Sequence, residues 1–99
     1  MRIGATPTHN FTLPVSVGLI DGVEIIYKQN GEEVLFKTKD DCTLSGNKVS
    51  TTLTQNETFQ FDTEANVEIQ IRAMTTEGKV LISDIFCVSA ERCLFDGVM

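Results

Sequence analysis

The only histidine of the chain, His9, limits the chemistry that these 99 residues could perform. A catalytic pair of histidines or a two-histidine metal site cannot come from one copy of the chain. His9 could still pair with one of the three cysteines, Cys42, Cys87 and Cys93, but nothing near it resembles the setting of a nucleophile. We therefore expect His9 to be a solvated side chain in an amino-terminal arm.

Fourteen acidic side chains offer a second kind of chemistry, the binding of a divalent cation. The short clusters Asp40-Asp41 and Asp62-Thr63-Glu64 could ligate calcium through their oxygens, but neither has the loop spacing of an EF-hand. No glycine-rich phosphate loop, nucleophile elbow or CxxC pair is present in the sequence. We therefore predict no catalytic residue, no metal, no cofactor and no small-molecule substrate, and a protein that is not an enzyme.

The charge balance excludes one class of partner and the hydropathy pattern another. Eight basic residues against 14 acidic ones leave a net charge of −6, and the basic residues are scattered, so we expect no nucleic-acid binding. The amino terminus lacks the apolar core of a signal peptide, and no run is long enough to span a membrane. We expect the cysteines to be small buried hydrophobes in a reducing compartment, with a bridge between Cys87 and Cys93 left open.

Turn signals at short intervals divide the chain into segments with the alternation of β-strands. Hairpins are predicted at Asn30-Gly31, at Ser45-Gly46-Asn47 and at Thr76-Glu77-Gly78. The only helical turn is predicted over residues 55–58, with Thr54 as its cap and a capping box. Seven to eight short strands in one domain, residues 1–99, indicate an antiparallel all-β sandwich or a small barrel.

The last predicted hairpin raises a question about surface. Its first arm alternates, with Val67, Ile69, Ile71 and Ala73 on one side, but the second arm is apolar on both sides. In a straight strand one face would carry Val80, Ile82, Phe86 and Val88, and the other Leu81, Ile85 and Cys87. A bulge at Ser83-Asp84 would instead shift the register, so that both sets serve one core. The sequence leaves both interpretations open.

The two ends of the chain differ from its middle. Residues 1–14 contain both prolines, Pro7 and Pro14, which is typical of an edge strand or an extended arm. Residues 93–99 form an apolar tail, which we expect either to pack back on the domain or to dock on another molecule. The predicted interface therefore combines the second arm with this tail: Val80, Ile82, Phe86, Val88, Leu94, Phe95, Val98 and Met99.

The order of these segments resembles a known group of proteins. The opening RIGATPTHNFTLP, then VSTTLTQNETFQF and VEIQIRAMTTEGKVLISDIFCVS, is similar to small uncharacterised proteins encoded in prophages of Firmicutes, especially clostridial ones. Residues 43–88 resemble, more loosely, the immunoglobulin-like amino-terminal module of phage baseplate upper proteins. The resemblance implies an immunoglobulin-like β-sandwich and a role in the virion or the bacterial host cytoplasm, and it identifies no catalytic residue.

These observations lead to one expected function and two alternatives. We expect a non-enzymatic phage structural or accessory protein, which contacts other virion or tail proteins, or itself, during virion or tail and baseplate assembly. One alternative is a capsid decoration subunit. The other is a soluble phage-encoded inhibitor of a host defence or regulatory protein, for which small size and an acidic surface are equally expected.

Overall fold

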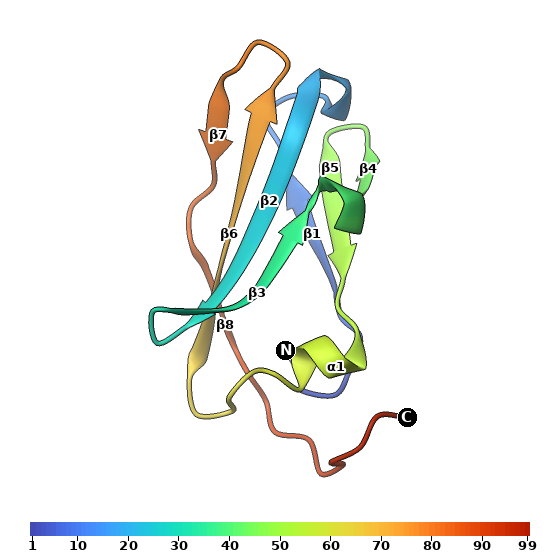
Figure 1. Cartoon of the computed structure of the whole chain (residues 1–99), viewed down its shortest axis with the longest axis vertical. Helices are drawn as coiled ribbons and strands as arrows, with labels where there is room; N and C mark the ends of the chain where they lie inside the picture. Colours follow the sequence, from blue (N-terminus) through green and yellow to red (C-terminus); the bar gives the residue numbers. More distant parts are fainter.

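A computed structural model describes residues 1–99 as eight strands in two antiparallel sheets (Figure 1). Strands β1, β5 and β4 form the smaller sheet in that order, and β3, β2 and β6 form the larger one, with β7 and β8 both paired to β6. The fold is therefore the predicted all-β sandwich. The strand bounds are β1 Thr8–Thr12, β2 Ile20–Gln29, β3 Glu32–Thr38, β4 Thr43–Ser45, β5 Lys48–Thr52, β6 Asn66–Thr75, β7 Val80–Ile82 and β8 Phe86–Ser89.

The connections between the sheets are those of an immunoglobulin-like sandwich. The chain changes sheet between β1 and β2, between β3 and β4, and between β5 and β6. In immunoglobulin nomenclature β1, β5 and β4 correspond to strands B, E and D, and β2 and β6 to C and F. Strand β3 then takes the place of C′, and β7 with β8 the place of G. The predicted all-β sandwich is thus present, with the strand order expected of an immunoglobulin-like fold.

All three predicted hairpins form, and each turns at residues with positive φ. Asn30 and Gly31 have φ of 53° and 79°, as a type I′ turn requires. Gly46 and Gly78 have φ of 62° and 86°, in the left-handed region that favours glycine.

The predicted helical turn is also present, as α1 Gln55–Thr58. The Oγ1 atom of Thr54 accepts from the backbone N–H of Glu57 at 3.2 Å, and Glu57 Oε1 accepts from the N–H of Thr54 at 2.8 Å. This reciprocal pair is the predicted capping box. Thr58 is fully buried, and its hydroxyl donates to the carbonyl of Ala5 at 3.0 Å, which attaches α1 to the amino-terminal segment. Two short 3-10 turns, Val17–Leu19 and Lys39–Asp41, complete the helical content.

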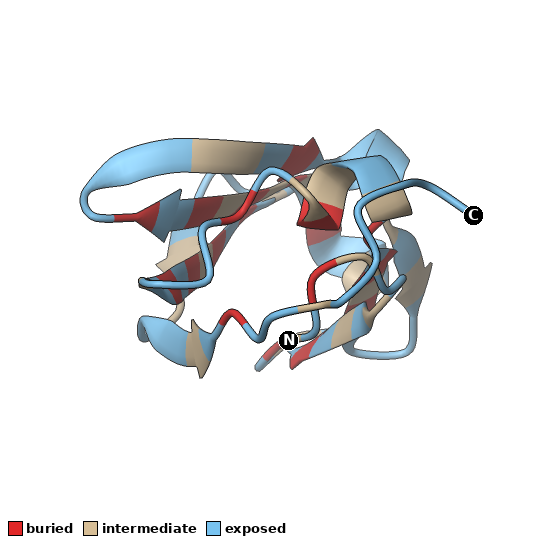
Figure 2. Cartoon of the chain, turned by 90° about the horizontal axis from the view of Figure 1, so that it is seen from below, coloured by how far each residue is buried: buried red, intermediate tan, exposed pale blue.

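The core lies between the two sheets and is filled by alternate residues of the long strands (Figure 2). Val67, Ile69, Ile71 and Ala73 of β6 are all buried, so the first arm of the last hairpin alternates as predicted. Tyr27 of β2 is fully buried at the centre.

The amino-terminal residues belong to the sandwich. Of the two structures expected for residues 1–14, the edge strand is present, because β1 pairs only with β5. Met1 to Ile3 run parallel to the chain after β8, with the N–H of Ile3 donating to the carbonyl of Glu91 at 3.0 Å. Ile3 is buried, so this segment closes part of the open side of the sandwich and is not a free arm.

The second arm of the last hairpin contains the bulge that was one of its two interpretations. On β7, Ile82 lies opposite Arg72, whereas on β8, Phe86 lies opposite Ile69. The three residues 83–85 therefore lie opposite only two residues of β6, 70 and 71. The one extra residue means that side chains after the bulge point to the opposite face of the sheet from the one that strict alternation would give. The N–H of Ser83 donates to the carbonyl of Ile71 at 3.0 Å, which holds the bulge in place.

Candidate protein-contact surface

The eight predicted interface residues do not lie on one surface. Val80 and Ile82 point outward from the larger sheet, because they pair with the outward residues Met74 and Arg72. Beyond the bulge, the register turns two members of the set, Phe86 and Val88, toward the smaller sheet. Phe86 contacts Phe11 of β1, with ring centroids 5.9 Å apart, and the remaining four residues lie in the tail.

The tail extends away from the sheets (Figure 2). Leu94 and Phe95 are more than three-quarters exposed, and Val98 and Met99 are exposed as well. One contact with the domain is a hydrogen bond of 2.9 Å from the N–H of Met99 to Gln55 Oε1. The side chains of Leu94, Phe95, Val98 and Met99 therefore do not pack back on the domain.

The larger sheet exposes an apolar surface on the side turned away from the smaller sheet, which we call the outer face. Ile82, Ile85 and Val80 are each more than half exposed, and Met74 and Phe36 are 48% and 40% exposed. A shallow hollow of about 520 Å³ lies on this face, lined in part by Ile26, Phe36, Ile82 and Ile85. Contiguous exposed apolar surface on a small domain is typical of a contact site. The outer face consists of Glu24, Ile26, Lys28, Phe36, Glu68, Gln70, Arg72, Met74, Val80, Ile82 and Ile85.

Polar side chains lie among the apolar side chains of the outer face. Arg72 forms an ion pair with Glu24 across the β2–β6 pair. Gln70 donates from Nε2 to the carbonyl of Ser83 at 2.8 Å, so its orientation is set by the bulge. The outer face therefore combines an exposed apolar surface with fixed polar groups, the composition of a protein-contact site.

Sequence reasoning missed Ile26, Phe36, Met74 and Ile85 as members of this surface. A signal for Ile26 was present, because it lies between Glu24 and Lys28 on what would otherwise be a wholly polar face of β2. Phe36 had no such signal. A register irregularity between Tyr27 and Lys28 places Phe36 opposite Ile26, and only this shift turns its ring outward.

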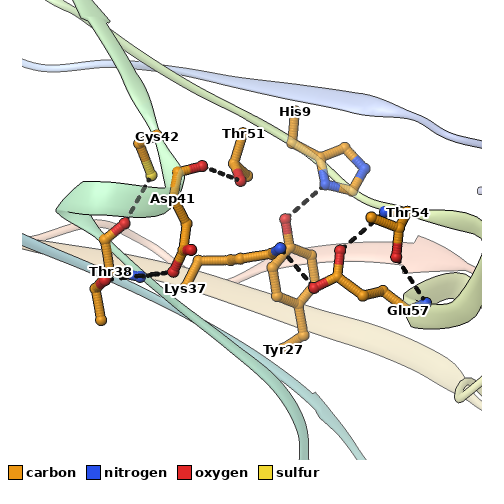
Figure 3. A network of polar contacts seen from close by, with 9 residues as sticks. All are labelled: His9, Tyr27, Lys37, Thr38, Asp41, Cys42, Thr51, Thr54 and Glu57. Atoms are coloured by element: carbon orange, nitrogen blue, oxygen red, sulfur yellow. Dashed lines mark hydrogen bonds and ion pairs between the residues drawn. The ribbon is translucent and has the colours of Figure 1, made fainter.

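The interior holds a polar cluster, shown in Figure 3, that includes the residue expected to be solvated. His9 points inward from β1, and its Nδ1 atom lies 2.7 Å from the hydroxyl of Tyr27. Burial, and then the amino-terminal charge, lower the pKa of His9, and burial raises the pKa of Tyr27. The prediction of a solvated His9 was wrong, because residues 8–12 form a strand whose alternate positions face the core.

An ion pair lies next to the His9–Tyr27 contact (Figure 3). Lys37 Nζ lies 2.6 Å from Glu57 Oε2, and the two side chains are only 9% and 21% exposed. Burial alone would raise the pKa of Glu57, but hydrogen bonds from Lys37 and Thr54 outweigh it and hold that pKa below its usual value. Each of these groups is engaged with a partner inside the cluster, as is typical of buried polar groups that stabilise a fold.

The cysteines and the acidic clusters have local roles. All three cysteines are free, and none is buried, so the expectation of small buried hydrophobes was wrong. Asp41 accepts from the N–H of Thr38 at 2.9 Å, which lowers the pKa of Asp41, and Asp62 accepts from the N–H of Glu64 at 2.9 Å. No three side chains of histidine, cysteine, aspartate or glutamate come together as a group that could hold a metal ion.

Fold and surface together define the class: a single immunoglobulin-like sandwich with an exposed apolar sheet face. Comparison with protein-family models, curated proteins and solved structures finds no match to this chain. None of its helices has the length and apolar character needed to cross a membrane.

Proposed function

We propose that this chain is a phage structural or accessory protein that acts by protein–protein contact in virion or tail and baseplate assembly. The observation that supports a contact role is the outer face, where Ile82, Ile85 and Val80 are each more than half exposed around polar groups of fixed orientation. The tail adds a second exposed apolar segment. The phage context rests on the sequence resemblance described above.

The geometry of the outer face favours a macromolecular partner. The hollow is open and lies across several strands of a sheet, whereas sites for small molecules usually enclose most of the ligand surface. The expected partners are other virion or tail proteins, or a second copy of the chain.

Quantitative mass spectrometry of purified virions tests this proposal. We expect the chain at a stoichiometric copy number relative to the capsid and tail proteins. A phage carrying Ile82→Lys should incorporate less of the protein, because the substitution places a charge in the apolar part of the outer face. Leu19→Lys is the matched control, since Leu19 is 53% exposed in the 3-10 turn before β2.

Absence of the chain from virions would overturn the proposal and favour an inhibitor of a host protein. Presence at a copy number equal to that of the major capsid protein would instead point to a decoration subunit. Equal incorporation of the Ile82→Lys and Leu19→Lys proteins would show that the outer face is not the contact surface in the particle.

A further inference from the structure

The charges on the outer face form a pattern that is complementary to itself. Strands β2 and β6 are antiparallel, and their outward residues pair across the sheet in three successive rows. Each of the two outer rows pairs one acidic with one basic residue, and the acidic residue is on β2 in one row and on β6 in the other. The two acidic residues therefore lie diagonally opposite each other, as do the two basic residues. The three rows are Glu24 with Arg72, Ile26 with Gln70, and Lys28 with Glu68.

A second copy related by a two-fold axis meets this pattern with opposite charges. With the axis across the strands, through the middle row, Glu24 faces Lys28 of the second copy. With the axis along the strands, Glu24 faces Arg72 of the second copy instead. Glu68 of the second copy faces Arg72 in the first orientation and Lys28 in the second. Both two-fold orientations are therefore electrostatically favourable.

Apolar side chains continue the middle row between the two charged rows. Phe36 lies opposite Ile26 on one side, and Ile85 lines the same hollow on the other side. Two copies placed face to face would therefore bury this row at the centre, where Gln70 is its one polar member, with ion pairs above and below it. An apolar centre with polar groups around it is the usual anatomy of a protein interface.

The net charge also favours this face over the rest of the surface for self-association. The chain carries −6, so two copies repel each other over most orientations. The four charged residues of the paired rows, Glu24, Lys28, Glu68 and Arg72, sum to zero, so the net charge of the chain lies outside these four residues. Glu33 of β3 pairs with Lys28 and adds one negative charge at the edge of this face, but the four central charges give no net repulsion at the centre of contact.

We propose that two copies of this chain associate through their outer faces as a two-fold dimer. This inference rests on the proposed role of the outer face as a contact surface, and it names the partner. The occupant is a second copy because the alternating charges and the apolar row are matched by their own rotated image.

Charge-reversed variants analysed by sedimentation equilibrium test the inference. One variant carries Glu24→Lys and Glu68→Lys, which makes its central charges all positive, and the other carries Lys28→Glu and Arg72→Glu, which makes them all negative. We expect the wild-type chain to dimerise at protein concentrations up to about 1 mM, the range of weak specific contacts. Each variant alone should dimerise at least about tenfold more weakly, because like charges then face each other in both two-fold orientations.

Mixing the two variants is the decisive step, because it restores opposite charges across the interface. We expect the mixture to form heterodimers, detected by native mass spectrometry from the different masses. Circular dichroism of each variant confirms that it is folded. Lys48→Glu on β5 of the smaller sheet is the matched control, and it should leave dimerisation unchanged.

A wild-type chain that stays monomeric at the highest concentration would overturn the inference, as would a dimer that ignores both charge-reversed variants. Loss of the dimer in a Leu94→Ser, Phe95→Ser variant, with no effect of charge reversal, would assign association to the tail. A monomer in solution that is stoichiometric in virions would refute the dimer and leave the proposed function standing. A charge-dependent dimer that is absent from virions would support the dimer and refute the proposed function.

Discussion

Replacing Glu57 by glutamine should destabilise the protein by about 3 kcal/mol, because it leaves the Lys37 ammonium buried without a counter-charge. Lys37 is 9% exposed at its side chain and Glu57 21%, with 2.6 Å between Nζ and Oε2. Removing one partner of a buried pair costs about 3–5 kcal/mol, and the exposed fifth of Glu57 places this site at the lower end. Glutamine can keep the capping hydrogen bond to Thr54, so the variant removes the charge and retains the cap.

Lys37→Met is the matched partner variant. It fills the same volume without a charge, and the remaining carboxylate keeps its hydrogen bonds at Thr54, so we expect a loss of less than about 1 kcal/mol. The double variant should resemble Lys37→Met, which gives a coupling energy of about 3 kcal/mol, equal to the cost of Glu57→Gln alone. Urea unfolding followed by circular dichroism and by the fluorescence of Tyr27, the only tyrosine, measures all three free energies of unfolding.

The pH dependence gives this prediction a sign. The folded pKa of Glu57 is lowered, so the contribution of the pair to stability is complete above the unfolded pKa of about 4.3. It is lost as the pH falls through the folded pKa, and the difference between wild type and Glu57→Gln should shrink there. Equal small losses for Glu57→Gln and Lys37→Met at pH 7 would refute the reasoning, because they would mean that water reaches the ammonium.

Three further predictions concern the interior and the turns. Burial lowers the pKa of His9, so the free energy of unfolding should fall as the pH drops below about 6.5. Urea unfolding at pH 7.5 and 5.5 measures this fall, which should be absent in His9→Gln. Burial raises the pKa of Tyr27, so absorbance near 295 nm should stay constant above pH 10 until the protein unfolds; a titration near pH 10 in the folded state would contradict this. Gly4→Ala should be more destabilising than Gly46→Ala by about 1–2 kcal/mol, because both have positive φ but only at Gly4 would a Cβ meet the Phe59 ring, at 3.0 Å; equal melting temperatures would contradict the close approach.

Local signals in the sequence were sufficient for most of the fold. Asn30-Gly31 determines a hairpin because few residues tolerate positive φ at two successive positions. The capping box at Thr54 and Glu57 needs only residues three apart, and both side-chain contacts are present. These features depend on the neighbouring chain alone, so the pattern of strands and turns could be read before any tertiary contact was known.

Features that depend on register could not be predicted with the same certainty. The bulge at residues 83–85 was one of two open interpretations. The free-energy cost of placing the Asp84 carboxylate on either face depends on which side chains pack beside it, and the local sequence does not show them. His9 was misplaced because nothing in its local sequence indicates that Tyr27, 18 residues away, provides a buried hydrogen-bond partner. Phe36 lies on the outer face only because of a one-residue irregularity in β2–β3 pairing.

The bulge also explains how the second arm of the last hairpin can be apolar on both sides without an apolar layer packed against each side. In a straight strand, Val80, Ile82, Phe86 and Val88 would form one stripe at the edge of the sheet, apolar except for Asp84 in its middle. The extra residue sends the second half of this stripe toward β1 and leaves Val80 and Ile82 outside. What remains on the outside joins Ile26 and Phe36 from strands distant in sequence. The exposed apolar surface is therefore a property of the whole sheet, and the sequence of one strand could reveal only its edge.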